Sequence, residues 1–167
     1  MKKILSLTLA LAMIGTILTG CGSKDAATKT PAENTQQTAP VQQEQSQTEK
    51  ALALINTFAS GDTETARELL DENYIQHNLA YGTGEDAFIG SVEYLASADV
   101  KTTVNNIRAF EDGDKVFLQT IYNFAGAGEQ VAFDIFRFDE DGKIAEHWDV
   151  METIADQSTW QNQNGKF

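Results

Sequence analysis

The chain has 167 residues with 25 acidic and 12 basic side chains, so its formal net charge is −13 at neutral pH. Nucleic acids and anionic headgroups are bound by clustered Lys and Arg, and this charge balance therefore excludes nucleic acid as a partner. The single cysteine excludes an internal disulfide.

The first twenty residues are predicted to be a leader rather than part of the fold. Lys2 and Lys3 form a basic start, and residues 4–18 form an apolar core that is short for a membrane-spanning helix. The motif LTGC at 18–21 resembles the lipobox of bacterial lipoproteins. In that family the cysteine is acylated and becomes the new N-terminus, which predicts a lipid anchor at Cys21 on the extracytoplasmic side of the cell membrane. The alternatives are an ordinary secretory signal or a membrane helix.

Residues 21–49 are predicted to be a disordered tether that follows the acylated cysteine. They are rich in Gln, Thr, Ala, Ser and Glu, contain Pro31 and Pro40, and have few large apolar side chains. Such a stretch buries too little surface to offset the entropy lost on ordering it. The remaining residues, 50–167, are predicted to form one domain.

Three stretches of this domain have apolar side chains at the spacing of an α-helix. The first ends at Gly61, since glycine commonly terminates helices. The second begins after Asp62, whose side chain suits an N-cap, and places Leu69 and Leu70 on its apolar face. The third covers residues 85–98.

After residue 100 the pattern changes to runs of β-branched and aromatic side chains separated by turn signals. Residues 100–111 and 115–125 are predicted strands, and 131–138 and 143–150 are predicted to form a hairpin around the turn at 139–142. Helices followed by strands predict an α+β domain in which three helices pack on a curved antiparallel sheet of about four strands. A curved sheet with helices on its concave side encloses a cone-shaped space, and the open end of this cone can admit a ligand.

Charged side chains interrupt the apolar runs of the predicted hairpin. Asp134 lies in the first strand, and His147 and Asp149 lie in the second. Aspartate is disfavoured inside strands, and an ionised carboxylate away from water is costly unless it is paired. Acidic groups on the wall of an apolar pocket commonly serve a ligand or a proton transfer. The hairpin therefore predicts a site as well as an architecture.

Three motifs together are similar to the SnoaL-like branch of the NTF2-like superfamily, which includes polyketide cyclases. They are YIQHN at 74–78, DIFR at 134–137 and GKIAEHWDV at 142–150. Relatives often have proline after the His-Asn pair, where this chain has Leu79. The resemblance covers nearly all of residues 50–167 and implies a cone-shaped α+β barrel that is commonly a homodimer.

The resemblance also implies a catalytic aspartate. In the cyclases the aspartate of the Trp-Asp pair is implicated in acid–base catalysis, and Asp149 matches it. Residues two apart in a strand share a face, so His147 is predicted to point the same way. An apolar cone raises the pKa of a carboxyl group and makes it a better base for removing a proton next to a carbonyl. His147, or His77 from the other side of the cone, could then donate to the enolate oxygen.

Six further side chains are candidates for ligand binding. They are Tyr74, Asn78, Tyr122, Asp134, Phe136 and Trp148. Structural roles are the alternatives: His147 and Asp149 could form a hydrogen-bonded pair or a dimer contact, and Asp134 could pair with Lys115. The aromatic candidates equally suit a core or an interface, and His77 equally suits the surface.

No metal or other cofactor is predicted. His77, His147 and Asp149 supply the two histidines and one carboxylate of a facial metal triad. They are, however, far apart in sequence and show no short ligand spacing. The sequence also has no phosphate-binding glycine loop. Two functions therefore remain open: cofactor-independent isomerase, cyclase or aldol-type chemistry on a small, largely apolar carbonyl compound, or a non-catalytic ligand-binding or dimerisation module.

Overall fold

The computed structural model describes residues 45–167. The predicted leader, Cys21 and most of the predicted tether lie outside the described residues, so these predictions stay predictions. Gln42–Phe167 form a compact unit, and this unit contains a hydrophobic core of its own. No helix in the described part of the chain is long and apolar enough to cross a membrane.

All three predicted helices are confirmed. They are α1 (Gln47–Ser60), α2 (Thr63–Leu69) and α3 (Glu85–Ser97). The first begins slightly before the predicted domain boundary, because Ser46 and Glu49 cap its N-terminus reciprocally. It ends at Gly61, which adopts the left-handed conformation with φ 76°. Asp62 caps the second helix as predicted.

A strand that the sequence did not predict, β1 (Leu70–Gln76), follows α2 directly. Leu70 was predicted on the apolar face of the second helix, but it is the first residue of this strand. β1 lies at the edge of the sheet and pairs in parallel with β5 (Ile144–Thr153). In the sequence LDENYIQ only Leu70 and Tyr74 are buried, so the alternation that identifies a half-buried strand is missing.

The other strands form the predicted antiparallel meander. They are β2 (Thr103–Asp112), β3 (Lys115–Asn123), β4 (Gln130–Phe138) and β5, with 3-10 turns at Phe124–Gly126 and Gln157–Thr159. The sheet order is β1-β5-β4-β3-β2. The α+β class is therefore confirmed, and the sheet has five strands of mixed direction rather than about four antiparallel ones.

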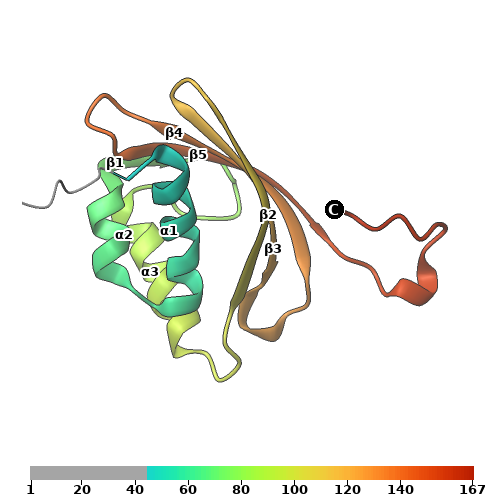
Figure 1. Cartoon of the computed structure of the whole chain (residues 1–167). Coiled ribbons are helices and arrows are strands. Elements are labelled where there is room, and N and C mark those ends of the chain that lie inside the picture. Colours follow the sequence, from blue (N-terminus) through green and yellow to red (C-terminus); the bar gives the residue numbers. More distant parts are fainter. Residues whose placement is uncertain (1–44) are drawn as a thin grey trace, which may run out of the picture. The chain divides into compact units, whose positions relative to one another are not determined.

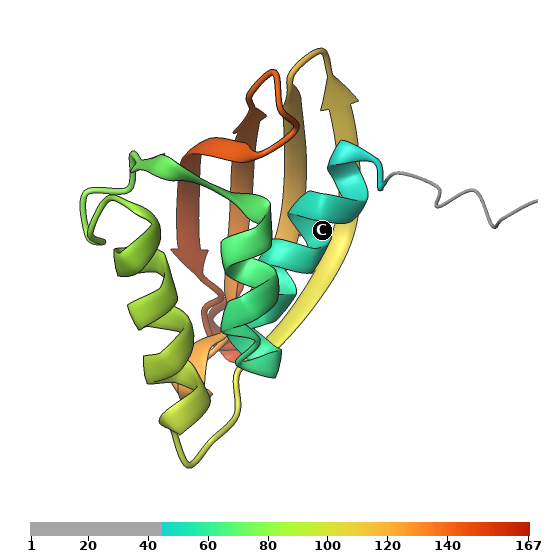
Figure 2. The same ribbon diagram turned by 90° about the vertical axis from the view of Figure 1, so that its left-hand side faces the viewer.

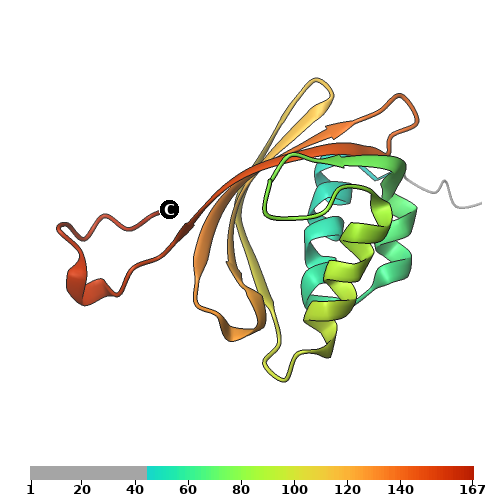
Figure 3. The same ribbon diagram turned by 180° about the vertical axis from the view of Figure 1, so that it is seen from behind.

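The helices cover the concave face of the curved sheet (Figures 1 and 2). The core forms between these two layers, and its largest fully buried side chains include Leu54, Ile55, Tyr74, Leu118, Phe136, Phe138 and Ile144. Seen from behind, the C-terminal tail extends on the side of the sheet away from the helices (Figure 3). It returns to the outer face, where the backbone oxygen of Lys166 accepts a hydrogen bond from Gln119 at 2.9 Å.

Candidate functional site

Helices α1 and α3 and the concave face of the sheet border a cavity of about 520 Å³. Its apolar wall includes Ile55, Phe58, Phe88, Leu95, Phe124, Phe136 and Met151. Its main polar groups come from Tyr74, Gln76, Tyr122, Asp134, His147 and Asp149. An apolar hollow with a few polar groups is the usual form of a small-molecule site.

Strand pairing brings three titratable side chains of this cavity together. Asp134 on β4 lies directly opposite Asp149 on β5, and Phe136 lies opposite His147. Since residues two apart share a face of a strand, these four side chains all lie on the concave face. One polar atom from each of Asp134, His147 and Asp149 lies within 4.8 Å of the other two. His147 and Asp149 thus share a face as expected, and Asp134 joins them.

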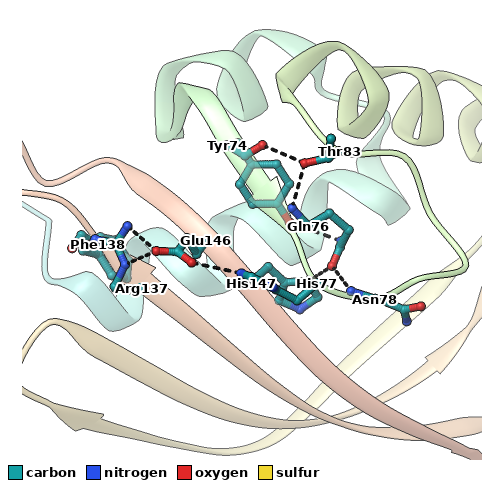
Figure 4. Close-up of polar contacts among 9 residues, drawn as sticks. All are labelled: Tyr74, Gln76, His77, Asn78, Thr83, Arg137, Phe138, Glu146 and His147. Atoms are coloured by element: carbon teal, nitrogen blue, oxygen red, sulfur yellow. Dashed lines mark hydrogen bonds and ion pairs between the residues drawn. The ribbon is translucent and has the colours of Figure 1, made fainter.

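The unpredicted strand β1 brings two amide side chains to this group. Gln76 is the parallel partner of His147, so Asn78 follows two residues later beside Asp149. The Gln76 Oε1 atom lies 3.1 Å from His147 Nδ1, and Asn78 Nδ2 donates to Asp149 Oδ1 at 2.6 Å. Figure 4 shows Gln76 between Tyr74 and Asn78, close to the His147 ring. Asn78 therefore acts on the cavity through Asp149.

Asp134 and His147 form a buried pair on the floor of the cavity. Their relative exposures are 3% and 8%, and His147 Nε2 lies 3.3 Å from Asp134 Oδ1. The hydroxyl of Tyr122 donates to the other carboxylate oxygen of Asp134 at 3.0 Å. The His147 ring stacks on Phe136 with centroids 4.5 Å apart. Burial at this depth makes an unpaired charge costly, so each of the two groups needs a polar partner.

Asp149 is half-buried, and the loss of hydration raises its pKa above the ordinary aspartate value. The charge of His147 and the hydrogen bond from Asn78 lower this pKa, and the nearby carboxylate of Asp134 raises it. Together these effects raise the pKa of Asp149. Asp149 is consequently a stronger base than a solvated aspartate, and it borders the cavity.

Two tyrosines supply hydroxyl donors to the same wall. Burial, followed by the charges of Asp149 and Asp134, raises the pKa of Tyr74 far above the ordinary tyrosine value. Burial and Asp134 act in the same direction on the pKa of Tyr122. Both phenols therefore stay protonated over the working pH range and can donate hydrogen bonds.

The structure does not place His77 or Trp148 in the cavity, which corrects their predicted ligand-facing positions. The β1–β5 register puts these two residues side by side on the outer face of the sheet. Their rings stack with centroids 4.4 Å apart and an interplanar angle of 4°. His77 Nε2 lies 2.9 Å from Glu146 Oε2, and Arg137 Nε donates to Glu146 Oε1 at 2.6 Å. Figure 4 shows Glu146 between Arg137 and the histidine side chains.

The six candidates for ligand binding therefore divide by location. Tyr74, Tyr122, Asp134 and Phe136 line the cavity, Asn78 reaches it through Asp149, and Trp148 is outside. Sequence reasoning missed Gln76 as a site residue. The signal that could have identified Gln76 is its position two residues before Asn78. Once residues 70–76 are recognised as a strand, this spacing places both side chains on one face.

His77 lies on the outer face of the sheet, away from His147 and Asp149, so the three residues considered above as a facial metal triad do not come together. Within the described residues, the atoms that converge belong instead to Asp134, His147 and Asp149. These atoms are engaged in hydrogen bonds: Tyr122 and His147 reach Asp134, and Asn78 reaches Asp149. We therefore interpret the group as a hydrogen-bond network and assign no metal to it.

A family model described as the SnoaL-like domain matches residues 51–147. A search of curated protein sequences finds no match to this chain. The matched range contains most of α1, all of α2, α3, β1, β2, β3 and β4, and the start of β5.

Solved structures support the same fold. An NTF2-like protein of unknown function from Cytophaga hutchinsonii is 17% identical, with a TM-score of 0.57 over 66% of this chain and 94% of that one. IdmH, a candidate polyketide cyclase from Streptomyces antibioticus, is 20% identical, with a TM-score of 0.52 over 65% and 93%. An LEH-like epoxide hydrolase from M. tuberculosis is 17% identical, with a TM-score of 0.54 over 62% and 80%. At these identities the likeness establishes the fold.

The raised pKa of Asp149 makes a prediction about stability. A carboxyl group whose pKa is higher in the folded than in the unfolded chain stabilises the fold below the ordinary value of 3.8. That contribution is lost as the pH rises through the folded value. Asp149→Asn should therefore raise the free energy of unfolding at pH 7 relative to wild type, and the gain should disappear below about pH 4. Urea denaturation across this pH range measures the difference.

Asp62→Asn is the matched control for this experiment. The backbone N–H of Thr65 lowers the pKa of Asp62, so its stabilising contribution is present above the ordinary value and is lost at low pH. Asp62→Asn should thus bring no gain at pH 7. An Asp149→Asn variant that is no more stable than wild type at pH 7 would contradict the desolvation of Asp149.

Proposed function

This chain belongs to the SnoaL-like domain family, and we propose that its cavity binds a small, largely apolar carbonyl compound and catalyses cofactor-independent acid–base chemistry on it. The reaction class is that of an isomerase, a cyclase or an aldol-type condensation. The observation that carries the proposal is Asp149, a carboxylate with a raised pKa on the wall of a mainly apolar cavity.

The size and lining of the cavity support the proposed ligand class. Its volume of about 520 Å³ lies within the range of roughly 300–1,000 Å³ that small-molecule sites occupy. The aromatic and aliphatic wall suits an apolar body. Tyr74 and His147 border the same cavity and would supply hydrogen-bond donors to a carbonyl oxygen.

In the proposed reaction, Asp149 removes a proton from the carbon next to the substrate carbonyl. The electron pair of the broken C–H bond moves toward the carbonyl oxygen, and the enolate that forms accepts hydrogen bonds from Tyr74 or His147. An isomerase would return the proton to a different carbon, whereas a cyclase or aldolase would join the enolate carbon to a second carbonyl. In the cyclase or aldol case the π electrons of the second carbonyl move to its oxygen as the carbon–carbon bond forms, and this oxygen takes the proton from Asp149. No step needs an external oxidant or reductant, so the proposal needs no cofactor.

We also propose that the protein is anchored to the cell membrane through acylated Cys21, with the cavity on the extracytoplasmic side. The support is the LTGC motif after a basic and apolar leader. The residues from 22 to the start of α1 would serve as the tether. A diacylated cysteine provides enough chain length for stable anchoring.

A second candidate function, dimerisation, is favoured by the outer face of the sheet. Apolar side chains lie next to one another across β2 to β5 and form an outer apolar row of Phe110, Phe117, Phe133, Ile135, Trp148 and Val150. Four of these residues are exposed large hydrophobics: Phe110, Phe117, Phe133 and Val150. Monomers rarely expose such contiguous apolar surface, and a stable interface needs about 800 Å² per partner. We propose that a second copy of this chain covers the row.

The catalytic proposal predicts enolisation by the isolated Gln42–Phe167 unit. Small cyclic ketones and diketones in heavy water should exchange their α-hydrogens faster in its presence, because Asp149 removes them. Asp149→Asn should lower the exchange rate by about 10²-fold or more, since a neutral amide cannot act as a base. Mass spectrometry of the recovered ketones measures the exchange.

His77→Gln is the matched control for enolisation, because His77 lies on the outer face of the sheet. This variant should exchange as fast as wild type. Equal exchange by Asp149→Asn and wild type would rule out Asp149 as the base. If no ketone exchanges but a panel member raises the melting temperature, the non-catalytic binding function would replace the catalytic one.

The anchoring proposal predicts that Cys21→Ser moves the protein out of the membrane fraction of a bacterial cell, because serine cannot carry the thioether-linked lipid. Ser23→Ala, a neighbouring substitution, should leave fractionation unchanged. Immunoblotting of separated fractions measures the distribution. Membrane retention of Cys21→Ser would contradict a lipid anchor at this residue.

The dimer proposal predicts twice the monomer mass for Gln42–Phe167 in analytical ultracentrifugation. Phe117→Lys should yield the monomer, because an unpaired charge in the middle of the outer apolar row is costly to bury. Leu79→Lys changes a fully exposed leucine outside the row and should leave the dimer intact. A monomeric wild type, or a dimeric Phe117→Lys, would contradict the proposed interface.

A further inference from the structure

We propose that Gln76 is a positioning residue that fixes the tautomer of His147, so that one transferable proton is held between His147 and Asp134 on the cavity floor. The use of this proton on a ligand rests on the proposed acid–base function. Its placement rests only on the hydrogen bonds of three side chains and one backbone amide.

The first step is the orientation of the Gln76 amide. The backbone N–H of Asn78 points at Gln76 Oε1 at a distance of 2.9 Å. A backbone N–H can only donate, so the atom that it meets must be the carbonyl oxygen. The amide nitrogen then faces the Tyr74 hydroxyl at 3.3 Å, which can accept. Figure 4 shows these contacts around Gln76.

The second step is the tautomer of His147. Its Nδ1 lies 3.1 Å from the same Gln76 oxygen, which only accepts, so Nδ1 must carry a hydrogen. In a neutral ring Nε2 is then a bare acceptor. It faces Asp134 Oδ1 at 3.3 Å, and two acceptors need a proton between them. The pair is therefore an imidazolium with a carboxylate or an imidazole with a carboxylic acid.

Both arrangements hold one proton and have no net charge, which fits the surroundings of the pair. The titratable groups that face it are Asp149 from β5, Tyr74 from β1 and Tyr122 from β3. Lys and Arg are absent from the described residues that line the cavity. A bare negative charge on deeply buried Asp134 would have no cation beside it, and the shared proton removes that cost.

The proton held between His147 and Asp134 would act together with Asp149, the proposed base. Asp149 would take a proton from substrate carbon as the C–H bond breaks, and the carbonyl oxygen would take the proton of the pair as the electrons reach it. Asp149 then becomes neutral and the pair becomes singly negative, so the summed charge of the three groups is unchanged. The reverse transfers restore the starting state after the new bond forms.

Nitrogen NMR on Gln42–Phe167 with ¹⁵N-labelled histidine rings tests the inference without any substrate. The chain has two histidines, so two sets of ring signals arise, and His77→Gln identifies them. His147 should carry its hydrogen on Nδ1 at every pH at which the domain is folded. Neutral His77 should carry it on Nε2, which faces the Glu146 carboxylate at 2.9 Å. A neutral His147 protonated only on Nε2 would overturn the inference.

Two substitutions test the role of Gln76 itself. Gln76→Leu removes the acceptor, so His147 should change to the Nε2–H tautomer and donate to Asp134. Gln76→Glu keeps an acceptor for both Asn78 and His147 and should keep the hydrogen on Nδ1. A folded Gln76→Leu that retains the Nδ1–H tautomer would overturn the positioning role. If Gln76→Leu does not fold, loss of the Nδ1 hydrogen in Gln76→Glu would overturn it instead.

A metal ion is the competing occupant of the position between His147 and Asp134. Protein treated with EDTA should give the same His147 spectrum as untreated protein. A change on stripping that zinc reverses would assign the position to a cation and overturn the inference. Failure of the proposed function is separate: an Nδ1–H signature without enolisation would contradict only the chemistry, and enolisation with an Nε2–H tautomer would contradict only the role of Gln76.

Discussion

The parallel pairing of β1 with β5 is the constraint on which the site depends. Gln76 lies beside His147, so each later residue of the chain falls beside the next residue of β5. Alternation then sends Gln76 and Asn78 inward to His147 and Asp149, and it sends His77 outward onto Trp148. A shift of one residue would exchange the two sets of side chains. The amide contacts inside and the ring stack outside thus support the same register.

The carboxylates on the two faces of the β4–β5–β1 part of the sheet have different kinds of partner. Outside, Glu146 lies between Arg137 and His77, and the hydrogen bond from His77 and the charge of Arg137 hold its pKa below the ordinary value. Inside, the carboxylates of Asp134 and Asp149 have hydroxyl, amide and imidazole partners. Charge on the inner face is therefore balanced by protons and dipoles rather than by fixed cations. Titratable groups gathered in a cavity in this way mark a candidate functional site.

The sequence predicted the parts of this structure that local signals encode. Gly61 and Asp62 mark helix ends, and the run of aromatic and β-branched residues at 131–138 marks a strand that contains Asp134. β1 has no comparable signal, because its middle is polar and its partner lies about 70 residues away in the chain. Gln76 was missed and His77 misplaced for this single reason. The pairing of β1 with β5 is determined by the tertiary fold, so this short edge strand shows no periodic pattern of apolar residues in its own sequence.

The residues that line the cavity come from two kinds of element, paired strands and a loop. Asp134, His147 and Asp149 lie on paired strands inside the sheet, whose register fixes their geometry. Tyr81 and Gly82 also line the cavity and come from the loop between β1 and α3, a kind of segment that tolerates sequence change better than a paired strand does. Substitutions in this loop would change the lining of the cavity and leave unchanged the strand register that holds Asp134, His147 and Asp149. Three solved structures that are 17% to 20% identical to this chain share its fold, so the arrangement of helices and sheet can persist while most side chains differ.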